Sequence, residues 1–155
     1  MILAVSDTGP IIHLDEIDAL DLLSTVDRLL VPQIVYEELG EGGVPSALES
    51  LEYELVTPNI QGPDESLDPG ETAALAVASG RSGVLLTDDL EARDAAERHD
   101  IEVHGSVGII VLAYHRGHIE KPRAIELMRS LQAETSLFIA DAVIERGIEL
   151  LGEST

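Results

Sequence analysis

The chain has 155 residues, a length that suits one compact domain, and its 45% hydrophobic residues can build a core although only 3% are aromatic. It contains no cysteine, which excludes a disulfide framework and thiol chemistry. Thirty acidic residues face nine basic ones, giving a formal net charge of −21, but the apolar content is too high for a disordered acidic segment.

The chain opens with a short apolar run, residues 1–5, which is soon followed by Asp7, Thr8, Gly9 and Pro10. An apolar run of this length with turn residues behind it is typical of a buried strand. Pro10 suits the first turn of a helix, where its missing N–H costs nothing. Asp7 is therefore predicted at the carboxyl end of the first strand, where it either caps the following helix or belongs to a binding site.

Strand and helix patterns alternate along the rest of the chain. The helix after Asp7 spans residues 9–24, with a break expected near 15–18. Further strands are predicted at residues 28–31, 53–56, 83–86 and 102–104, and a loop at 57–69. Further helices are predicted at residues 32–39, 45–51, 68–80, 90–99, 105–116, 122–131 and 137–151. This alternation predicts a three-layer α/β/α fold with a short central parallel sheet and extra C-terminal helices.

Four acidic positions fall near the carboxyl edge of the predicted sheet, where ligands bind in folds of this kind. They are Asp7, Glu37 with Glu38, Glu71, and Asp88 with Asp89. At about 4 Å and an effective dielectric of about 20, each like-charged pair costs about 4 kcal/mol, so gathered carboxylates need protons or a cation. Hard oxygen ligands suit Mg²⁺ or Mn²⁺, which can activate a water and neutralise charge on a phosphate. The pattern indicates nuclease chemistry.

The segments around these acids resemble the PIN-domain nuclease family, and in particular its VapC-like toxin branch from prokaryotic toxin–antitoxin pairs. The resemblance covers most of residues 1–120 and rests on the ordered set of motifs more than on any single one. The matching segments are residues 6–10, 31–39, 67–74, 85–89 and 103–108.

The resemblance implies metal-dependent cleavage of RNA in a shared acidic pocket. It assigns the catalytic and metal-binding acids to positions that match the family's motif: Asp7, Glu38 in preference to Glu37, Glu71, and Asp89 with Asp88 as a rival metal ligand. The cofactor would be Mg²⁺ or Mn²⁺. The partners would be an RNA substrate, a small antitoxin protein and a second copy of the chain in a homodimer. A hydroxyl from Thr8 or Ser6 would help position a water at the metal.

Other functional readings stay open. A catalytically silent PIN-like binding module would share the fold. A phospho-acceptor receiver domain also gathers aspartates, but it needs a lysine after a late strand, and Lys121, which lies in a polar stretch, is the only lysine. A phosphatase of the haloacid dehalogenase type is disfavoured because Gly9 stands where its second aspartate would be.

Residues 1–155 are expected to form one domain, with a nuclease core at 1–120 and C-terminal helices at 121–155. The apolar stripe of the last predicted helix, from Leu137 and Phe138 to Leu151, favours a core role over a dimer seam or an antitoxin groove. Arg93 and Arg98 are interpreted as salt-bridge partners of Asp94 or Glu97 more readily than as substrate contacts. His13, His115 and His118 are assigned structural or surface roles.

The charge balance predicts a carboxylate-covered surface of the halophilic kind, because the Debye length falls to ~3 Å at 1 M salt and self-repulsion is then screened. No apolar run approaches the ~18–20 residues needed to cross a bilayer. Residues 1–5 are too short for a signal peptide and lack a basic start. A cytoplasmic protein without membrane contact is expected.

Overall fold

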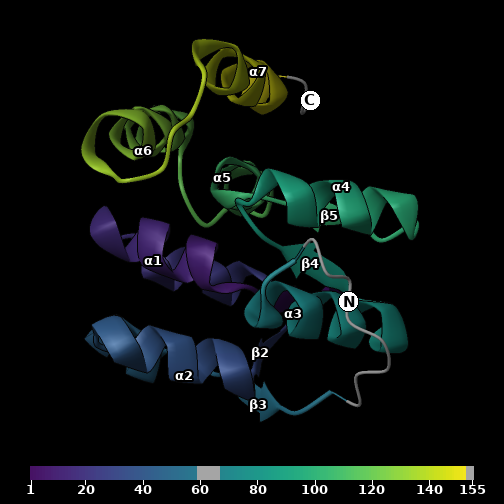
Figure 1. The fold of residues 1–155 in the computed structure, drawn as a ribbon. Helices are drawn as coiled ribbons and strands as arrows, with labels where there is room; N and C mark the ends of the chain where they lie inside the picture. Colours follow the sequence, from purple (N-terminus) through teal and green to yellow (C-terminus); the bar gives the residue numbers. More distant parts are fainter. Residues whose placement is uncertain (59–66, 153–155) are drawn as a thin grey trace.

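Five short strands form one parallel sheet in the order β3-β2-β1-β4-β5. A computed structural model describes residues 1–58 and 67–152 (Figure 1). The strands are β1 (Leu3–Ser6), β2 (Arg28–Pro32), β3 (Glu54–Val56), β4 (Val84–Leu86) and β5 (Val103–His104). Strand β1 pairs with β2 on one side and with β4 on the other. The direction in which successive strands are added to the sheet therefore reverses between β1 and β4. Open α/β sheets bind ligands at the carboxyl ends of the strands beside such a switch point.

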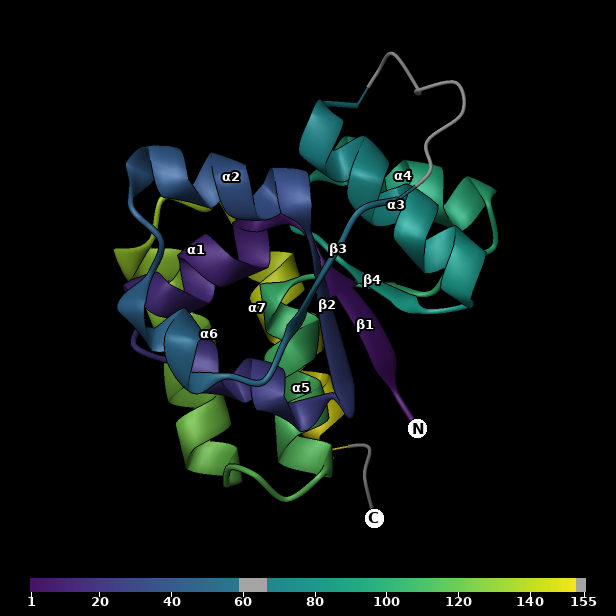
Figure 2. The ribbon, with the colours of Figure 1, turned by 90° about the horizontal axis from the view of Figure 1, so that it is seen from below.

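Helices cover both faces of this sheet, which confirms the predicted three-layer fold. The helices are α1 (Thr8–Glu16), α2 (Gln33–Gly42), α3 (Pro69–Arg81), α4 (Leu90–Arg98), α5 (Ser106–His115), α6 (Lys121–Glu134) and α7 (Asp141–Gly152). Helices α3 and α4 lie on one side of the sheet, and α1, α2 and the three C-terminal helices lie on the other (Figures 1 and 2). None of the helices in the described ranges is long and apolar enough to cross a membrane.

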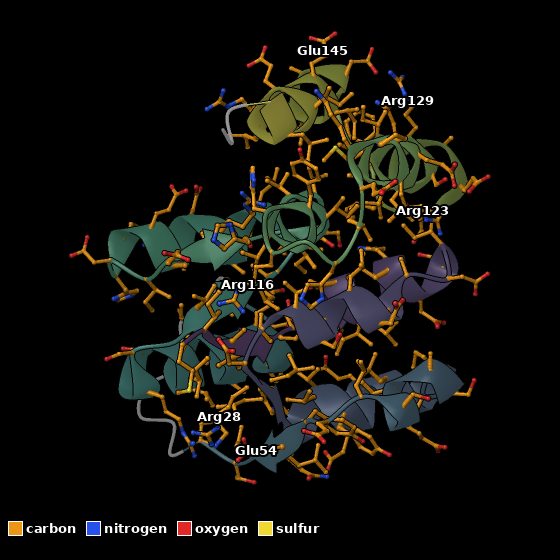
Figure 3. All side chains as sticks on the ribbon, turned by 180° about the vertical axis from the view of Figure 1, so that it is seen from behind. Arg28, Glu54, Arg116, Arg123, Arg129 and Glu145 are labelled. Carbon is orange, nitrogen blue, oxygen red and sulfur yellow. The ribbon has the colours of Figure 1, made fainter. Side chains whose placement is uncertain are left out.

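Alternate strand residues supply the two halves of the core. Val5 and Leu85 are buried against the alanine-rich faces of α3 and α4, while Ala4 and Leu86 join the larger cluster formed by the other helices. The small residues in α3 allow the helix to approach the sheet closely, as its composition predicts; Ala74 is fully buried. At the far edge of the sheet, exposed Arg28 of β2 pairs with Glu54 of β3 at 2.9 Å (Figure 3).

Several predicted boundaries need correction. The first helix breaks as expected: α1 ends at Glu16, Asp18 adopts a positive φ of 54°, and residues Leu20–Thr25 form a 3₁₀ helix. A second 3₁₀ helix, Ser46–Ser50, replaces the short helix predicted at 45–51. Helix α2 continues past Gly40 to Gly42, where Gly43 ends it with φ 93°. Most of the loop predicted at 57–69 lies outside the described residues.

The C-terminal region differs most from the prediction. Helix α6 is longer than predicted, and α7 begins only at Asp141, so residues 137–140 lie between the two helices. The side-chain amide of Gln132 donates to the carbonyl of Ile139 and to Oδ1 of Asp141, which fixes this connection. The assignment of Phe138 to the core is wrong, because its side chain is 92% exposed. Ile144 and Leu151 do pack into the core.

Candidate active site

Three helices begin with an aspartate at the carboxyl edge of the sheet. Asp7 caps α1 by accepting the N–H of Thr8 at 2.8 Å, and Asp68 caps α3 by accepting the N–H of Glu71 at 2.8 Å. Asp89 caps α4 through a longer contact with the N–H of Ala92, 3.3 Å. A side-chain oxygen at the N-cap satisfies a free backbone donor, and the positive end of the helix dipole favours negative charge there. The capping role of these three acids therefore also brings their carboxylates to the same edge of the sheet.

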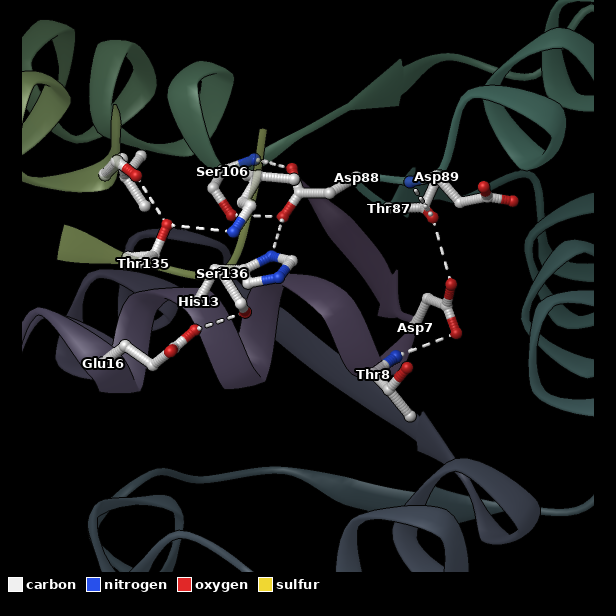
Figure 4. Close-up of polar contacts among 12 residues, drawn as sticks. Asp7, Thr8, His13, Glu16, Thr87, Asp88, Asp89, Ser106, Thr135 and Ser136 are labelled. Carbon is white, nitrogen blue, oxygen red and sulfur yellow. Dashed lines mark hydrogen bonds and ion pairs between the residues drawn. The ribbon is translucent and has the colours of Figure 1, made fainter. Parts of the chain in front are cut away.

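Asp7 lies in the centre of this edge and is only 4% exposed. Its second carboxylate oxygen accepts the hydroxyl of Thr87 at 3.0 Å, across the switch point (Figure 4). Burial raises the pKa of Asp7 from 3.8 to about 6, and the two hydrogen bonds offset only part of that effect. The nearby charges of Asp68 and Asp89 raise the pKa further. Asp7 thus carries a charge near neutral pH that the protein alone compensates poorly.

Glu71, in the first turn of α3, faces two of the capping aspartates. Burial raises the pKa of Glu71 far above its ordinary range, and the close carboxyl groups of Asp89 and Asp68 raise it further. A protonated Glu71 can donate its O–H to the carboxylate of Asp89 or Asp68, and these hydrogen bonds contribute to the raised pKa. Oε2 of Glu71 is buried and has no hydrogen-bond partner of its own among the described residues.

Glu38 reaches the same edge from α2. Its carboxylate accepts the backbone N–H of Gly70, and a Cβ atom added to Gly70 would lie 2.7 Å from Oε2 of Glu38. The absence of a side chain at Gly70 therefore makes room for this carboxylate. Burial raises the pKa of Glu38, and the charges of Asp68 and Asp7 add to the effect.

The structure thus gathers Asp7, Glu38, Asp68, Glu71 and Asp89, which we call the acid cluster. Four of these residues were predicted as site acids from the sequence, and Asp68 was not. The position of Asp68, three residues before Glu71, was the one feature of the sequence that could have indicated it. Glu37, the rival of Glu38, is exposed. The hydroxyl of Ser6 donates to the backbone oxygen of Asp7, so the side-chain hydroxyl that meets the Asp7 carboxylate is that of Thr87.

Asp88 points away from the acid cluster, although it adjoins Asp89 in the chain (Figure 4). One carboxylate oxygen accepts the backbone N–H of Ser106 at 2.6 Å. The other accepts the hydroxyl of Ser106 at 2.6 Å and lies 2.8 Å from Nδ1 of His13. Asp88 therefore ties the end of β4 to α1 and to the start of α5, and its oxygens are already occupied. His13 is partly buried and has the structural role that was predicted for it.

The donor chemistry of the acid cluster fits a small divalent cation. Its side chains offer only carboxylate oxygens, the ligands that Mg²⁺ and Mn²⁺ prefer. Burial is the main cause of the raised pKa values of Asp7, Glu38 and Glu71 and the neighbouring carboxylates add to it, so a bound cation would favour the ionised forms. No three acidic or histidine side chains in the described part of the chain are yet close enough together to hold an ion as they stand. Binding would therefore require the carboxylates to close around the ion.

Comparisons with known proteins agree with this geometry. A family profile described as PIN domain matches residues 3–153. A solved structure of a PilT N-terminus domain protein from the hyperthermophilic archaeon Sulfolobus solfataricus P2 is similar to this chain, with a TM-score of 0.60 and 15% sequence identity. The match covers 77% of this chain and 97% of that one, and at this identity it shows a shared fold. A search of curated proteins returned no significant match.

Proposed function

The chain belongs to the PIN-domain family, and we propose that it is a Mg²⁺- or Mn²⁺-dependent endoribonuclease that hydrolyses RNA phosphodiester bonds at the acid cluster. PIN domains are generally nucleases, which supports the reaction class. The observation that carries the proposal is Glu71, whose buried Oε2 lacks a partner beside the carboxyl groups of Asp68 and Asp89. The sheet order β3-β2-β1-β4-β5 also differs from the 2-1-3-4-5 order of flavodoxin-like receiver domains.

Asp7, Glu38, Glu71 and Asp89 would hold the cation, with Asp68 as an additional acid beside them. A divalent ion bound there would supply a Lewis acid that polarises the phosphate and lowers the pKa of water. Thr87 and the N–H of Thr8 orient the carboxylate of Asp7. The strongly raised pKa of Glu71 favours its protonated form in the cation-free protein, and a bound cation would favour the ionised form.

A biological role follows from the same resemblance. We propose that the protein is the toxin of a toxin–antitoxin pair that acts in the cytoplasm, as a homodimer controlled by a small antitoxin protein. The support is the likeness of residues 6–10, 31–39, 67–74, 85–89 and 103–108 to the VapC-like branch. A gene for a small partner protein beside the gene of this protein would support the proposed toxin role.

Cleavage of labelled single-stranded RNA tests the proposal. The protein should cut RNA in Mn²⁺ at high salt, and EDTA should stop the reaction. Asp7→Asn and Glu71→Gln should reduce cleavage to the level seen with EDTA, whereas Asp94→Asn, on the exposed side of α4, should cut like the unmodified protein. RNA that stays intact across several sequences would favour the silent binding module, and cleavage by Asp7→Asn would refute the assigned site.

A further inference from the structure

We propose that the groove beside the acid cluster is a binding subsite for single-stranded RNA, in which Phe138 stacks on a base and Arg93 contacts a phosphate. The choice of RNA as the occupant rests on the proposed function. The subsite itself rests on a cavity, an anchored but exposed aromatic ring and a guanidinium that forms no ion pair with a carboxylate among the described residues.

The groove begins at the loop that carries Asp89. Its cavity has a volume of about 320 Å³, and its lining includes Asp88 and Leu90, the two chain neighbours of Asp89. It then runs between α4, the start of α5 and the segment before α7, where Phe138 lines it, and it reaches Val143 in the first turn of α7. The groove thus starts at the two chain neighbours of Asp89, on the side of the loop toward which Asp88 points.

Phe138 is held outward by a fixed backbone. The N–H of Leu137 donates to Oγ1 of Thr135 at 3.2 Å, and the carbonyl of Ile139 accepts the amide of Gln132 at 3.0 Å. Ile139 is only 8% exposed, yet Phe138 between these anchors is 92% exposed. An aromatic face held in this way, and the only phenylalanine of the chain, is ready to stack on a base at little entropic cost.

Arg93 supplies positive charge on the opposite wall. Its Nη1 atom lies against Gly105, at 2.6 Å from where a Cβ atom would stand, so the lack of a side chain there leaves space for the guanidinium. Within residues 1–58 and 67–152 no ion pair is found for Arg93, and the predicted pairing with Asp94 or Glu97 does not form. Asp88 also approaches Gly105, but its oxygens bind Ser106 and His13.

The wider surroundings favour an anion. A second hollow of about 360 Å³ shares Arg93 and Gly105 with the groove and adds His104 and Arg146. Asp88 is the only acid that lines either hollow in the described part of the chain. Arg146 pairs with Glu149 at 3.2 Å and His104 lies 3.0 Å from a carboxylate oxygen of Glu102, so Arg93 carries the positive charge that a phosphate would meet here.

A second copy of the chain fits the groove less well. Stable homodimers bury about 800 Å² per partner, mostly apolar at the centre. Only Leu90, Phe138 and Val143 expose large apolar side chains at this groove among the described residues. A copy seated there would also leave the Arg93 guanidinium buried without its own anion, which is costly.

Equilibrium binding tests the subsite in the full chain. In an Asp7→Asn background, which prevents cleavage, fluorescence anisotropy would follow a labelled single-stranded RNA of mixed sequence. Phe138→Ala should weaken binding roughly 5- to 150-fold, the effect of losing one stacked base, whereas Phe138→Tyr should restore it. Arg93→Ala should weaken binding and lower the slope of log affinity against log salt by about 0.7, the value for one phosphate of a single strand. Leu55→Ala, which removes an exposed leucine at the far edge of the sheet, is the matched control and should bind normally.

A direct reporter is available because the chain has no tryptophan. The emission of Phe138→Trp should be quenched when RNA binds, in proportion to the anisotropy signal. In cleavage-competent protein, Phe138→Ala should raise KM and leave kcat unchanged.

The outcomes separate the two proposals. Unchanged RNA affinity in Phe138→Ala and Arg93→Ala would overturn the subsite while leaving the nuclease function intact. Binding through Phe138 by a protein that cuts no RNA would support the subsite and refute the nuclease. A dimer that Phe138→Ala dissociates, without any change in RNA affinity, would assign the surface to a second copy and also overturn the subsite.

Discussion

The hydroxyl of Thr87, at the end of β4, lies 3.0 Å from Oδ2 of Asp7, at the end of β1, although the two residues are 80 positions apart. The same hydroxyl oxygen accepts the backbone N–H of Asp89 at 3.2 Å. One buried side chain therefore sets the relative position of two acids that come from different strands. Thr87, at the end of β4, therefore connects the sheet to two acids of the acid cluster.

Loss of that hydroxyl should disturb both acids. Thr87→Val keeps the shape of the side chain but removes the hydrogen bonds to Oδ2 of Asp7 and to the N–H of Asp89. We expect a loss of about 1–3 kcal/mol in the free energy of unfolding and weaker Mn²⁺ binding, both measured against the unmodified protein. Thr87→Ser should keep most of each property. Equal Mn²⁺ affinity in the valine and serine variants would show that Thr87 does not orient the site.

The buried charge of Asp7 should make the cation-free protein less stable as pH rises. The folded state holds the Asp7 proton up to about pH 6 but the unfolded state only to about 3.8, so the folded state binds more protons between these values. The free energy of unfolding should therefore fall across this window, by about 3 kcal/mol for a shift of this size. In EDTA, Asp7→Asn should unfold like the unmodified protein near pH 4 and be more stable by about 1–3 kcal/mol at pH 8. Asp94→Asn serves as the surface control, and the same gain in that variant would contradict the assignment.

The contact between Gly70 and Glu38 can be tested within one helix. Gly70→Ala would place Cβ 2.7 Å from Oε2 of Glu38, so the carboxylate must move and RNA cleavage should fall. Gly80→Ala is the matched change, since a Cβ there meets nothing within 4 Å in the same helix. It should stabilise the protein by about 0.5–1 kcal/mol through helix propensity and leave cleavage unchanged. Similar activity in the two variants would argue against a role for Glu38.

Asp88 and Asp89 should behave differently when each is replaced by asparagine. Asp88→Asn disturbs a buried carboxylate that contacts Ser106 and His13, so it should cost about 2–3 kcal/mol of stability and leave the number of bound Mn²⁺ ions unchanged. Asp89→Asn should weaken Mn²⁺ binding with a smaller effect on unfolding. Urea unfolding and Mn²⁺ titration measure the two effects. A large loss of stability in Asp89→Asn together with weaker Mn²⁺ binding in Asp88→Asn would show that the two roles are assigned the wrong way round.

The net charge of −21 should make folding depend on salt. Raising KCl from 0.1 M to about 1 M shortens the Debye length from ~10 Å to ~3 Å and weakens repulsion among surface carboxylates. We expect Tm to rise markedly over this range and to rise equally in NaCl, because the effect is screening. A Tm that is already as high in dilute buffer would remove the halophilic interpretation.

The local sequence patterns predicted the strands, the sheet class and the place of Asp7, because each depends on short apolar runs and turn residues. They could not separate Asp88 from Asp89, since that choice depends on Ser106 and His13, which lie 18 and 75 positions from Asp88. Asp68 was missed because a helix cap and a site residue look alike in sequence. The apolar stripe that includes Phe138 suggested core, and only the contacts that anchor residues 137–139 reveal its exposure.

The most direct test of the central claim is an equilibrium titration of Mn²⁺ followed by electron paramagnetic resonance, with unmodified protein and Glu71→Gln compared at pH 7.5. We expect saturable binding by the unmodified protein. The variant should lose affinity by about 10- to 100-fold or more, the range that removal of even an outer-shell partner causes. Glu37→Gln, which changes an exposed acid of α2, should bind like the unmodified protein. Equal Mn²⁺ affinity in the unmodified protein and Glu71→Gln would contradict the claim that the acid cluster is a metal site.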